Sequence, residues 1–215
     1  MYFKEINHYG DRGLIIDFGI EISKDISQEI NATIIYLKDL KLPALNTIPS
    51  YNKIVLHFKN TEDKQKSIQT LEIMMKDFRP LDIKRPYKRW NIPTCYEPQY
   101  ALDLERVQKF HDLSIQEIIN LHTKKIYYNY YIGFMPGFPY LGEISSKLIT
   151  PRLSSPRVRI PARSVGIAKE HTCIYPKVSP GGWNIIAQVP FDIFNLDHSR
   201  TSLFLPGDEV KFNRV

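Results

Sequence analysis

Residues 125–141 read Lys-Ile-Tyr-Tyr-Asn-Tyr-Tyr-Ile-Gly-Phe-Met-Pro-Gly-Phe-Pro-Tyr-Leu, and they mark a change in the character of the chain. Tyrosine and isoleucine favour pleated, half-buried strands, whereas proline and glycine favour the turns between strands. More short apolar runs follow at residues 165–168, 172–175, 183–189 and 209–212. Short strands separated by such turns are typical of a β-barrel or sandwich, which is our prediction for this part of the chain.

The chain before this region alternates between strand-like and helix-like patterns. An apolar run at 14–18 predicts a strand, and apolar residues at three- and four-residue intervals over 26–37 predict a helix that Ser23 or Asp25 can cap. The two patterns recur at 53–58 and 68–78, which gives the order β-α-β-α. Prolines and basic residues at 80–89 predict a linker. We therefore expect an α+β domain over residues 1–87 and a β-barrel domain over residues 88–215.

Two short helices are predicted between the linker and the strands. Asp103 stands where it can cap a helix that places Leu104, Val107 and Phe110 on one side. Residues 114–117, Ser-Ile-Gln-Glu, have the pattern of a capping box, in which the serine hydroxyl accepts from a backbone N–H and the glutamate reaches back.

Composition excludes several classes of protein. The chain has 215 residues, of which 43% are hydrophobic and 24% charged, values typical of a folded globular protein. No apolar stretch approaches the roughly 18 residues of a membrane helix, and the N-terminus lacks the layout of a signal peptide, so we expect a cytoplasmic protein with no membrane partner. The two cysteines, Cys95 and Cys173, are too few for a disulfide framework.

The sequence lacks the usual signatures of catalytic and cofactor sites. It has no Walker loop, dinucleotide glycine fingerprint or nucleophile elbow. Its histidines never fall at i, i+2 or i, i+4, so we expect no metal site. Cys173 and His171 could form a nucleophile pair on one face of a strand, although a small buried thiol is the preferred interpretation because no third, orienting residue is evident.

The positive charge of the chain is concentrated in one segment. The formal net charge is +6, from 29 basic and 23 acidic residues, and residues 147–177 contain seven basic residues against one acidic residue, Glu170. The remaining chain is therefore balanced, at 22 against 22. Prolines hold this segment in constrained turns, so it predicts a focused anion site more than a surface for nucleic acid. Ordinary solvated charges are the alternative interpretation.

Three segments resemble a known family. Gly133–Leu141, Pro156–Val165 and Ile174–Trp183, in that order and spacing, resemble the family of the 5-oxoprolinase B subunit, also called allophanate hydrolase subunit 1 and the kinase-A inhibitor. The resemblance implies an N-terminal α+β domain followed by a cyclophilin-like, carboxyltransferase-like β-barrel. It also implies two partners, the larger C subunit and the A subunit of 5-oxoprolinase. Together the three subunits would use ATP to open 5-oxoproline to L-glutamate, and any Mg²⁺ would enter bound to the ATP. The alternatives are an inhibitor that binds the dimerisation domain of a sensor histidine kinase, and an allophanate hydrolase subunit.

The same segments supply the candidate site. Arg157 and Arg159 alternate along one strand-like stretch, where two guanidinium groups could hold a carboxylate or phosphoryl oxygen, and we predict a catalytic role for both. Phe138, Tyr140 and Trp183 would form the apolar body of the site. Gly137, Gly181 and Gly182 would let the backbone approach an anion. Further substrate- or anion-binding candidates are Pro136, Arg152, Thr172, Tyr175 and Ser179.

The sequence departs from the family pattern inside these segments. Arg163 and Lys169 stand where glycines are usual, Cys173 replaces another glycine, and Gln188 replaces a common arginine. A glycine replaced by a larger residue either closes a pocket or loses a turn with positive φ. We therefore expect the fold to follow the family more closely than the ligand does.

Overall fold

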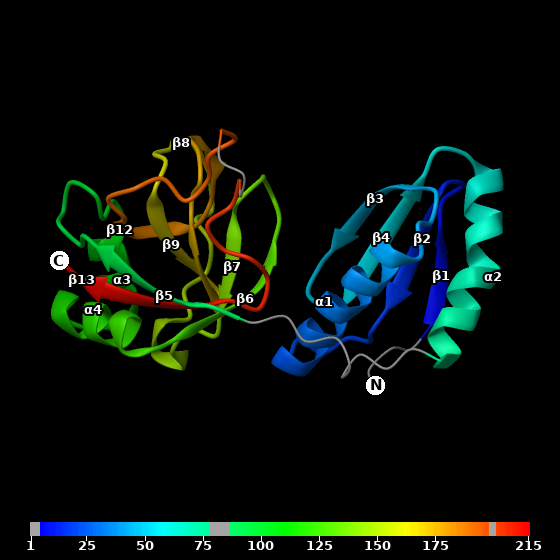
Figure 1. The fold of residues 1–215 in the computed structure, drawn as a ribbon. Helices are drawn as coiled ribbons and strands as arrows, with labels where there is room; N and C mark the ends of the chain where they lie inside the picture. The colour runs from blue at the N-terminus through cyan, green and yellow to red at the C-terminus, as the bar shows by residue number, and fades with distance from the viewer. Residues whose placement is uncertain (1–4, 78–86, 198–200) are drawn as a thin grey trace. The chain divides into compact units, whose positions relative to one another are not determined.

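The computed structural model describes residues 5–77, 87–197 and 201–215. The chain folds into two compact units, Met1–Pro86 and Tyr87–Val215, whose elements are labelled in Figure 1 and which are each described by themselves. Residues 78–86, which contain most of the predicted linker, lie outside the described residues.

The first unit is a four-stranded sheet with two helices. The sheet has the order β1-β2-β4-β3, and every neighbouring pair is antiparallel. Its elements are β1 (Glu5–Tyr9), β2 (Gly13–Asp17), α1 (Lys24–Asp39), β3 (Ala44–Pro49), β4 (Lys53–Phe58) and α2 (Thr61–Asp77).

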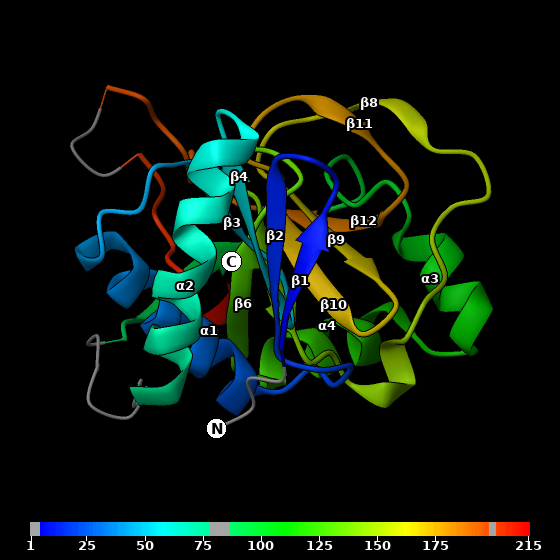
Figure 2. The same cartoon turned by 90° about the vertical axis from the view of Figure 1, so that its right-hand side faces the viewer.

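One face of this sheet forms the core of the first unit. Residues of β4 are alternately buried and half-buried, so every second side chain faces the core. Both helices supply side chains to the same core, α1 through residues such as Ile26 and Ile30 and α2 through Leu71. Figure 2 shows the two helices beside the sheet.

The predicted order β-α-β-α lacks two strands that the structure contains. The strands β1 and β3 lie at the two edges of the sheet, and none of their residues is buried. Ile6 of β1 and Ala44 of β3 pack against the core while half-buried. Because neither strand has an alternation of apolar residues over its length, hydrophobic periodicity did not predict either strand. The strand predicted at 53–58 and the helix capped by Ser23 are confirmed, with the Ser23 hydroxyl accepting from the Ile26 amide at 3.2 Å.

The second unit is built on a seven-stranded sheet in the order β12-β9-β10-β7-β6-β13-β5, with a separate ribbon of β11 and β8. The strands are β5 (Arg89–Thr94), β6 (Tyr127–Ile132), β7 (Pro139–Gly142), β8 (Arg157–Ile160), β9 (Ser164–Ala168), β10 (His171–Ile174), β11 (Ser179–Gly181), β12 (Asn184–Gln188) and β13 (Glu209–Arg214). The helices are α3 (Leu104–His111), α4 (Ile115–Lys124) and the short 3-10 helix η2 (Ser146–Leu148).

The two outer strands of the large sheet meet, so the sheet closes into a barrel. Cys95, directly after β5, and Gln188, at the end of β12, exchange two backbone hydrogen bonds of 2.8 and 2.9 Å. The fold class predicted from the sequence, α+β with a barrel, is therefore confirmed.

The sheet of the second unit separates two groups of buried side chains. The larger core includes Ile174 and Ile186 and also takes in α3 and α4. The smaller group contains the neighbours of these residues along the strands, Cys173 and Ile185, together with Phe138, Tyr175 and Trp183. Because successive side chains of a strand point to opposite faces, the smaller group lies on the other side of β10 and β12.

The two predicted helices are present, but only one has the predicted cap. Ser114 accepts from the Glu117 amide at 3.2 Å and Glu117 accepts from the Ser114 amide at 2.8 Å, which confirms the capping box. Asp103 stands at the N-cap of α3 but makes no side-chain cap hydrogen bond. The prediction that Asp103 caps this helix is wrong because its carboxylate has other partners, described below.

Candidate functional site

The smaller buried group is an aromatic cluster at the edge of the β8–β11 ribbon. Phe138 lies at its centre, with ring centroids 5.1 Å from Tyr140, 5.1 Å from Tyr175 and 5.8 Å from Trp183. Tyr140 stacks on Tyr131, with centroids 4.4 Å apart and planes within 8°. The structure thus brings together the apolar residues that the sequence predicted for one site, and it adds Tyr131, for which the sequence held no signal beyond its place in the tyrosine-rich strand.

Arg152 lies over this cluster. Its guanidinium carbon is 5.9 Å from the centroid of Trp183, a cation–π contact. Burial raises the pKa of the hydroxyls of Tyr131, Tyr140 and Tyr175, and the positive charge of Arg152 opposes that rise in all three. Arg152 therefore lies close to several phenol groups and supplies positive charge to them.

Arg157, predicted to hold a ligand anion, holds a carboxylate of the protein instead. Its two terminal nitrogens donate to the two oxygens of Asp103 at 2.8 and 2.6 Å. The Asp103 side chain is 4% exposed and also accepts from the backbone amide of Ile185 at 2.7 Å. The bidentate face of Arg157 is thus occupied in this structure, and the pair attaches the ribbon to α3 and β12. The catalytic role of Arg157 stays a prediction.

The two other predictions on strands β8 and β10 have different outcomes. Arg159 is exposed and has no hydrogen bond or ion pair with any residue in the described part of the chain. Thr172 is fully buried and lies on the opposite side of β10 from Tyr175. Its hydroxyl donates to the Gly166 carbonyl at 3.1 Å and contacts Nε2 of His122 at 3.0 Å. Thr172 therefore belongs to the main core and not to the aromatic cluster.

Two of the three candidate glycines are closely packed against side chains. A Cβ on Gly137, whose φ is +80°, would lie 2.5 Å from the ring of Phe194, and one on Gly181 would lie 2.5 Å from the Tyr175 hydroxyl. Gly182 has more room, since its nearest neighbours would be 3.8 Å away, and its carbonyl accepts from the Leu153 amide at 2.8 Å. Pro136, beside Gly137, is exposed.

Ser179 has a buried hydroxyl with no hydrogen-bond partner in the described structure. The residue is 7% exposed and pairs with Ile160 across the β8–β11 ribbon. Residues directly opposite in an antiparallel pair share a face, and Ile160 packs into the aromatic cluster. The side chain of Ser179 therefore lies on the cluster side of the ribbon.

Two of the four departures from the family pattern keep the left-handed backbone conformation that glycine favours. Arg163 has φ of +69° and Lys169 has φ of +49°, so both positions retain left-handed turns despite their side chains. Cys173 is buried in the aromatic cluster, and burial raises the pKa of its thiol well above the usual value. A buried neutral thiol is a poor nucleophile, which favours packing over a Cys–His pair. Gln188 donates to the Ala162 carbonyl at 3.1 Å.

The described residues contain neither a candidate metal site nor a candidate membrane-spanning helix. No group of three or more histidine, cysteine, aspartate or glutamate side chains there is arranged to hold a metal ion. No helix in the described ranges combines the length and the apolar character needed to cross a membrane.

Residues 4–204 match the family model described as carboxyltransferase domain, subdomain C and D. Among solved structures, the chain superimposes on TTHA0988 with a TM-score of 0.83 at 30% identity, covering 95% of this chain and 40% of that one. This chain therefore spans about two fifths of TTHA0988. It also resembles the Kluyveromyces lactis urea carboxylase, with a TM-score of 0.72 at 16% identity over 98% of this chain and 21% of that one, a likeness in fold alone. The fold is thus that of a carboxyltransferase-type domain.

Curated relatives narrow this class. The chain is 35% identical to the B subunit of 5-oxoprolinase from Bacillus subtilis, over 98% of this chain and 92% of the relative. It is 36% identical to the B subunit of 5-oxoprolinase from Haemophilus influenzae, over 78% of this chain and 75% of the relative. The chain belongs to the family of 5-oxoprolinase B subunits, within the carboxyltransferase domain, subdomain C and D, class.

Proposed function

We propose that this chain is the B subunit of a 5-oxoprolinase complex that opens the lactam of 5-oxoproline to L-glutamate at the expense of ATP. The observation that carries the proposal is the 35% identity to a 5-oxoprolinase B subunit over 98% of the chain. The name of that relative refers to one component of a larger assembly. The proposal therefore includes two partners, an A subunit and a larger, carboxyltransferase-like C subunit.

The length of TTHA0988 supports a partner of this kind. The present chain covers 95% of its own length but only 40% of TTHA0988, so in that protein a domain of this fold is joined covalently to a longer stretch of chain. The present chain would correspond to that domain as a separate protein, and its larger partner would be a second chain that is not covalently joined to it. In this proposal ATP, with Mg²⁺, is a substrate of the complex.

Reconstitution tests the proposal. The chain is purified and mixed with candidate A and C subunits from the same cells, and glutamate and phosphate release are measured with 5-oxoproline and ATP. We expect both products only when all three proteins are present, and photo-crosslinking with an azido-ATP would identify the one that binds the nucleotide. Equal turnover by the A and C subunits without this chain would contradict the proposal. So would recovery of a sensor histidine kinase as the only specific partner of the tagged chain, together with no glutamate production.

A further inference from the structure

Arg152 lies over a ring of the aromatic cluster, and its guanidinium has no acidic partner among the described residues. Arg157 pairs with Asp103, and Arg163 lies 3.9 Å from Asp192. Within the described ranges, Arg152 has neither a hydrogen bond nor an ion pair, and its guanidinium lies over the Trp183 ring. The side chain is exposed, so an anion can reach it from solvent, and the ring beneath it restricts the orientations of the guanidinium.

Flat aromatic surface surrounds this charge. Tyr131 and Tyr140 are both half-buried, their rings are stacked in parallel planes, and their hydroxyls are hydrogen-bonded to each other. Tyr140 also touches Trp183, with ring centroids 5.8 Å apart. A guanidinium beside partly exposed, rigid rings suits a small molecule that is flat, apolar on its faces and negatively charged at one end.

The unpaired Ser179 hydroxyl is a second feature on the same side of the ribbon. A buried hydroxyl without a partner destabilises the folded protein relative to a hydrogen-bonded one, because its desolvation is not compensated. Such groups are uncommon in native structures, and a ligand can supply the missing partner. Two independent features therefore converge on the aromatic cluster: a guanidinium without a carboxylate and a hydroxyl without a hydrogen bond.

We propose that Arg152, Tyr131, Tyr140 and Trp183 form a recognition surface for a small cyclic amide that carries a carboxylate, with the guanidinium of Arg152 pairing with that carboxylate. The Ser179 hydroxyl is then the candidate partner for the amide group of the ring. The identity of the amide as 5-oxoproline rests on the proposed function, whereas the charge and shape of the ligand rest on the residues. This assigns anion recognition to Arg152 and not to Arg157.

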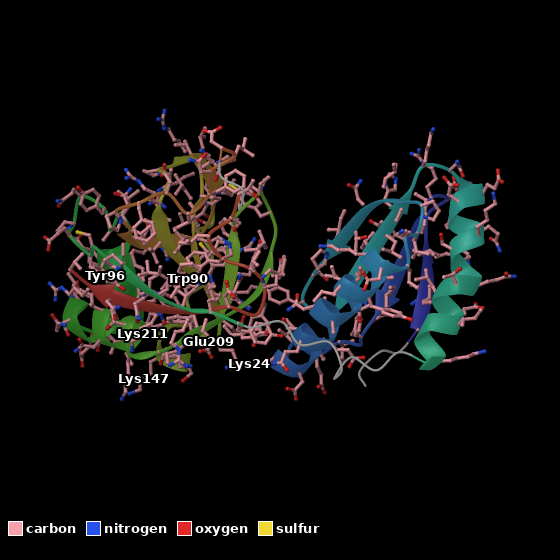
Figure 3. The ribbon with its side chains drawn as sticks, in the orientation of Figure 1. Lys24, Trp90, Tyr96, Lys147, Glu209 and Lys211 are labelled. Carbon is pink, nitrogen blue, oxygen red and sulfur yellow. The ribbon has the colours of Figure 1, made fainter. Side chains whose placement is uncertain are left out.

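The two tryptophans make binding measurable in the isolated full chain. Trp183 lies in the cluster, whereas Trp90 lies on β5 (Figure 3), where its indole nitrogen donates to Asp208 at 3.1 Å. In ¹⁵N-labelled protein, with the indole signals assigned by a Trp90→Phe variant, we expect 5-oxoproline to shift the Trp183 signal saturably and to leave Trp90 in place. Pyrrolidin-2-one, which lacks the carboxylate, should bind about tenfold more weakly, since a charge-assisted hydrogen bond contributes on the order of one factor of ten or more.

Matched variants distinguish specific recognition of the carboxylate by Arg152 from a general effect of positive charge on the protein. Arg152→Ala should weaken 5-oxoproline binding about tenfold or more, and Arg152→Lys should recover only part of it because lysine lacks the planar fork. Lys109→Ala is the control, because it removes an exposed positive charge on α3, a helix that packs into the larger core. It should leave binding unchanged.

The outcomes distinguish this inference from the proposed function. No saturable shift of Trp183 at millimolar 5-oxoproline, or an equal loss in Lys109→Ala and Arg152→Ala, would overturn the recognition surface. If the reconstituted complex turns over and Arg152→Ala leaves its KM for 5-oxoproline unchanged, the recognition surface fails while the proposed function stands. If 5-oxoproline binds through Arg152 but no complex turns it over, the proposed function fails while the recognition surface stands.

Discussion

Arg157 and Asp103, 54 positions apart in the chain, form a bidentate ion pair that joins the β8–β11 ribbon to the start of α3. The carboxylate is almost fully buried and the guanidinium side chain is 30% exposed. Among the described residues, the Asp103 carboxylate accepts three hydrogen bonds, one of them from the Ile185 amide. Removal of the arginine would leave a buried carboxylate without its countercharge.

The first prediction concerns this pair. Arg157→Ala should lower the free energy of unfolding by about 2–3 kcal/mol, below the full range for a buried pair because Arg157 is partly exposed to solvent. Urea unfolding followed by circular dichroism measures the change. Arg159→Ala, at an exposed position on the same strand, should stay within about 0.5 kcal/mol of the parent. Equal effects of the two variants would show that the ion pair does not stabilise the fold.

The second prediction concerns the pH dependence of stability. His122 is fully buried, with Nδ1 2.6 Å from the Tyr96 hydroxyl, and burial lowers its pKa from 6.5 to about 3. The unfolded chain therefore binds a proton at this imidazole over a pH range in which the folded chain does not. By linkage, stability falls as pH decreases from about 6.5 towards 3, and this residue should account for about 2 kcal/mol by about pH 5.

A His122→Gln variant provides the comparison, because it cannot titrate. The difference in free energy of unfolding between parent and variant should shrink as the pH is lowered from neutral to about 5. Denaturant titrations at several pH values measure it. A difference that stays constant with pH would mean that His122 is not kept neutral by burial.

The third prediction compares two adjacent glycines. A Cβ on Gly181 would lie 2.5 Å from the Tyr175 hydroxyl and 2.8 Å from Ile160, whereas one on Gly182 would meet nothing closer than 3.8 Å. Gly181→Ala should therefore destabilise the protein by about 1–3 kcal/mol through overpacking, and Gly182→Ala should be nearly neutral. Thermal unfolding distinguishes the two. Equal melting temperatures would contradict the close packing of Gly181 against Tyr175.

The fourth prediction concerns the turn between β9 and β10. Lys169 is exposed and has φ of +49°, a conformation that costs a non-glycine residue about 1–2 kcal/mol. Lys169→Gly should raise the free energy of unfolding by about 0.5–1 kcal/mol, because the greater flexibility of glycine in the unfolded chain offsets part of the gain. Lys177→Gly, at an exposed lysine without a positive φ, should lower it. Stabilisation by both changes would indicate a charge effect in place of backbone strain.

Some elements could be predicted from the sequence because their signals are local. The strand at 53–58 alternates buried and half-buried residues over its whole length, and the capping box at Ser114 needs only the backbone within three residues. The edge strands β1 and β3 have no such pattern. They form because a partner strand, supplied from elsewhere in the fold, satisfies their backbone hydrogen bonds.

The candidate site likewise has one part that could be predicted from the sequence and one part that could not. The sequence by itself determined that aromatic residues, glycines and an excess of positive charge occur together between residues 133 and 183, because composition and spacing are properties of the chain alone. Only the tertiary structure decided which arginine meets an acid and which does not. The pairing of Arg157 with Asp103 spans 54 residues, and the placement of Arg152 over Trp183 depends on two loops meeting. Contacts between distant segments are set by how the barrel closes and packs, and no local pattern of residues encodes them.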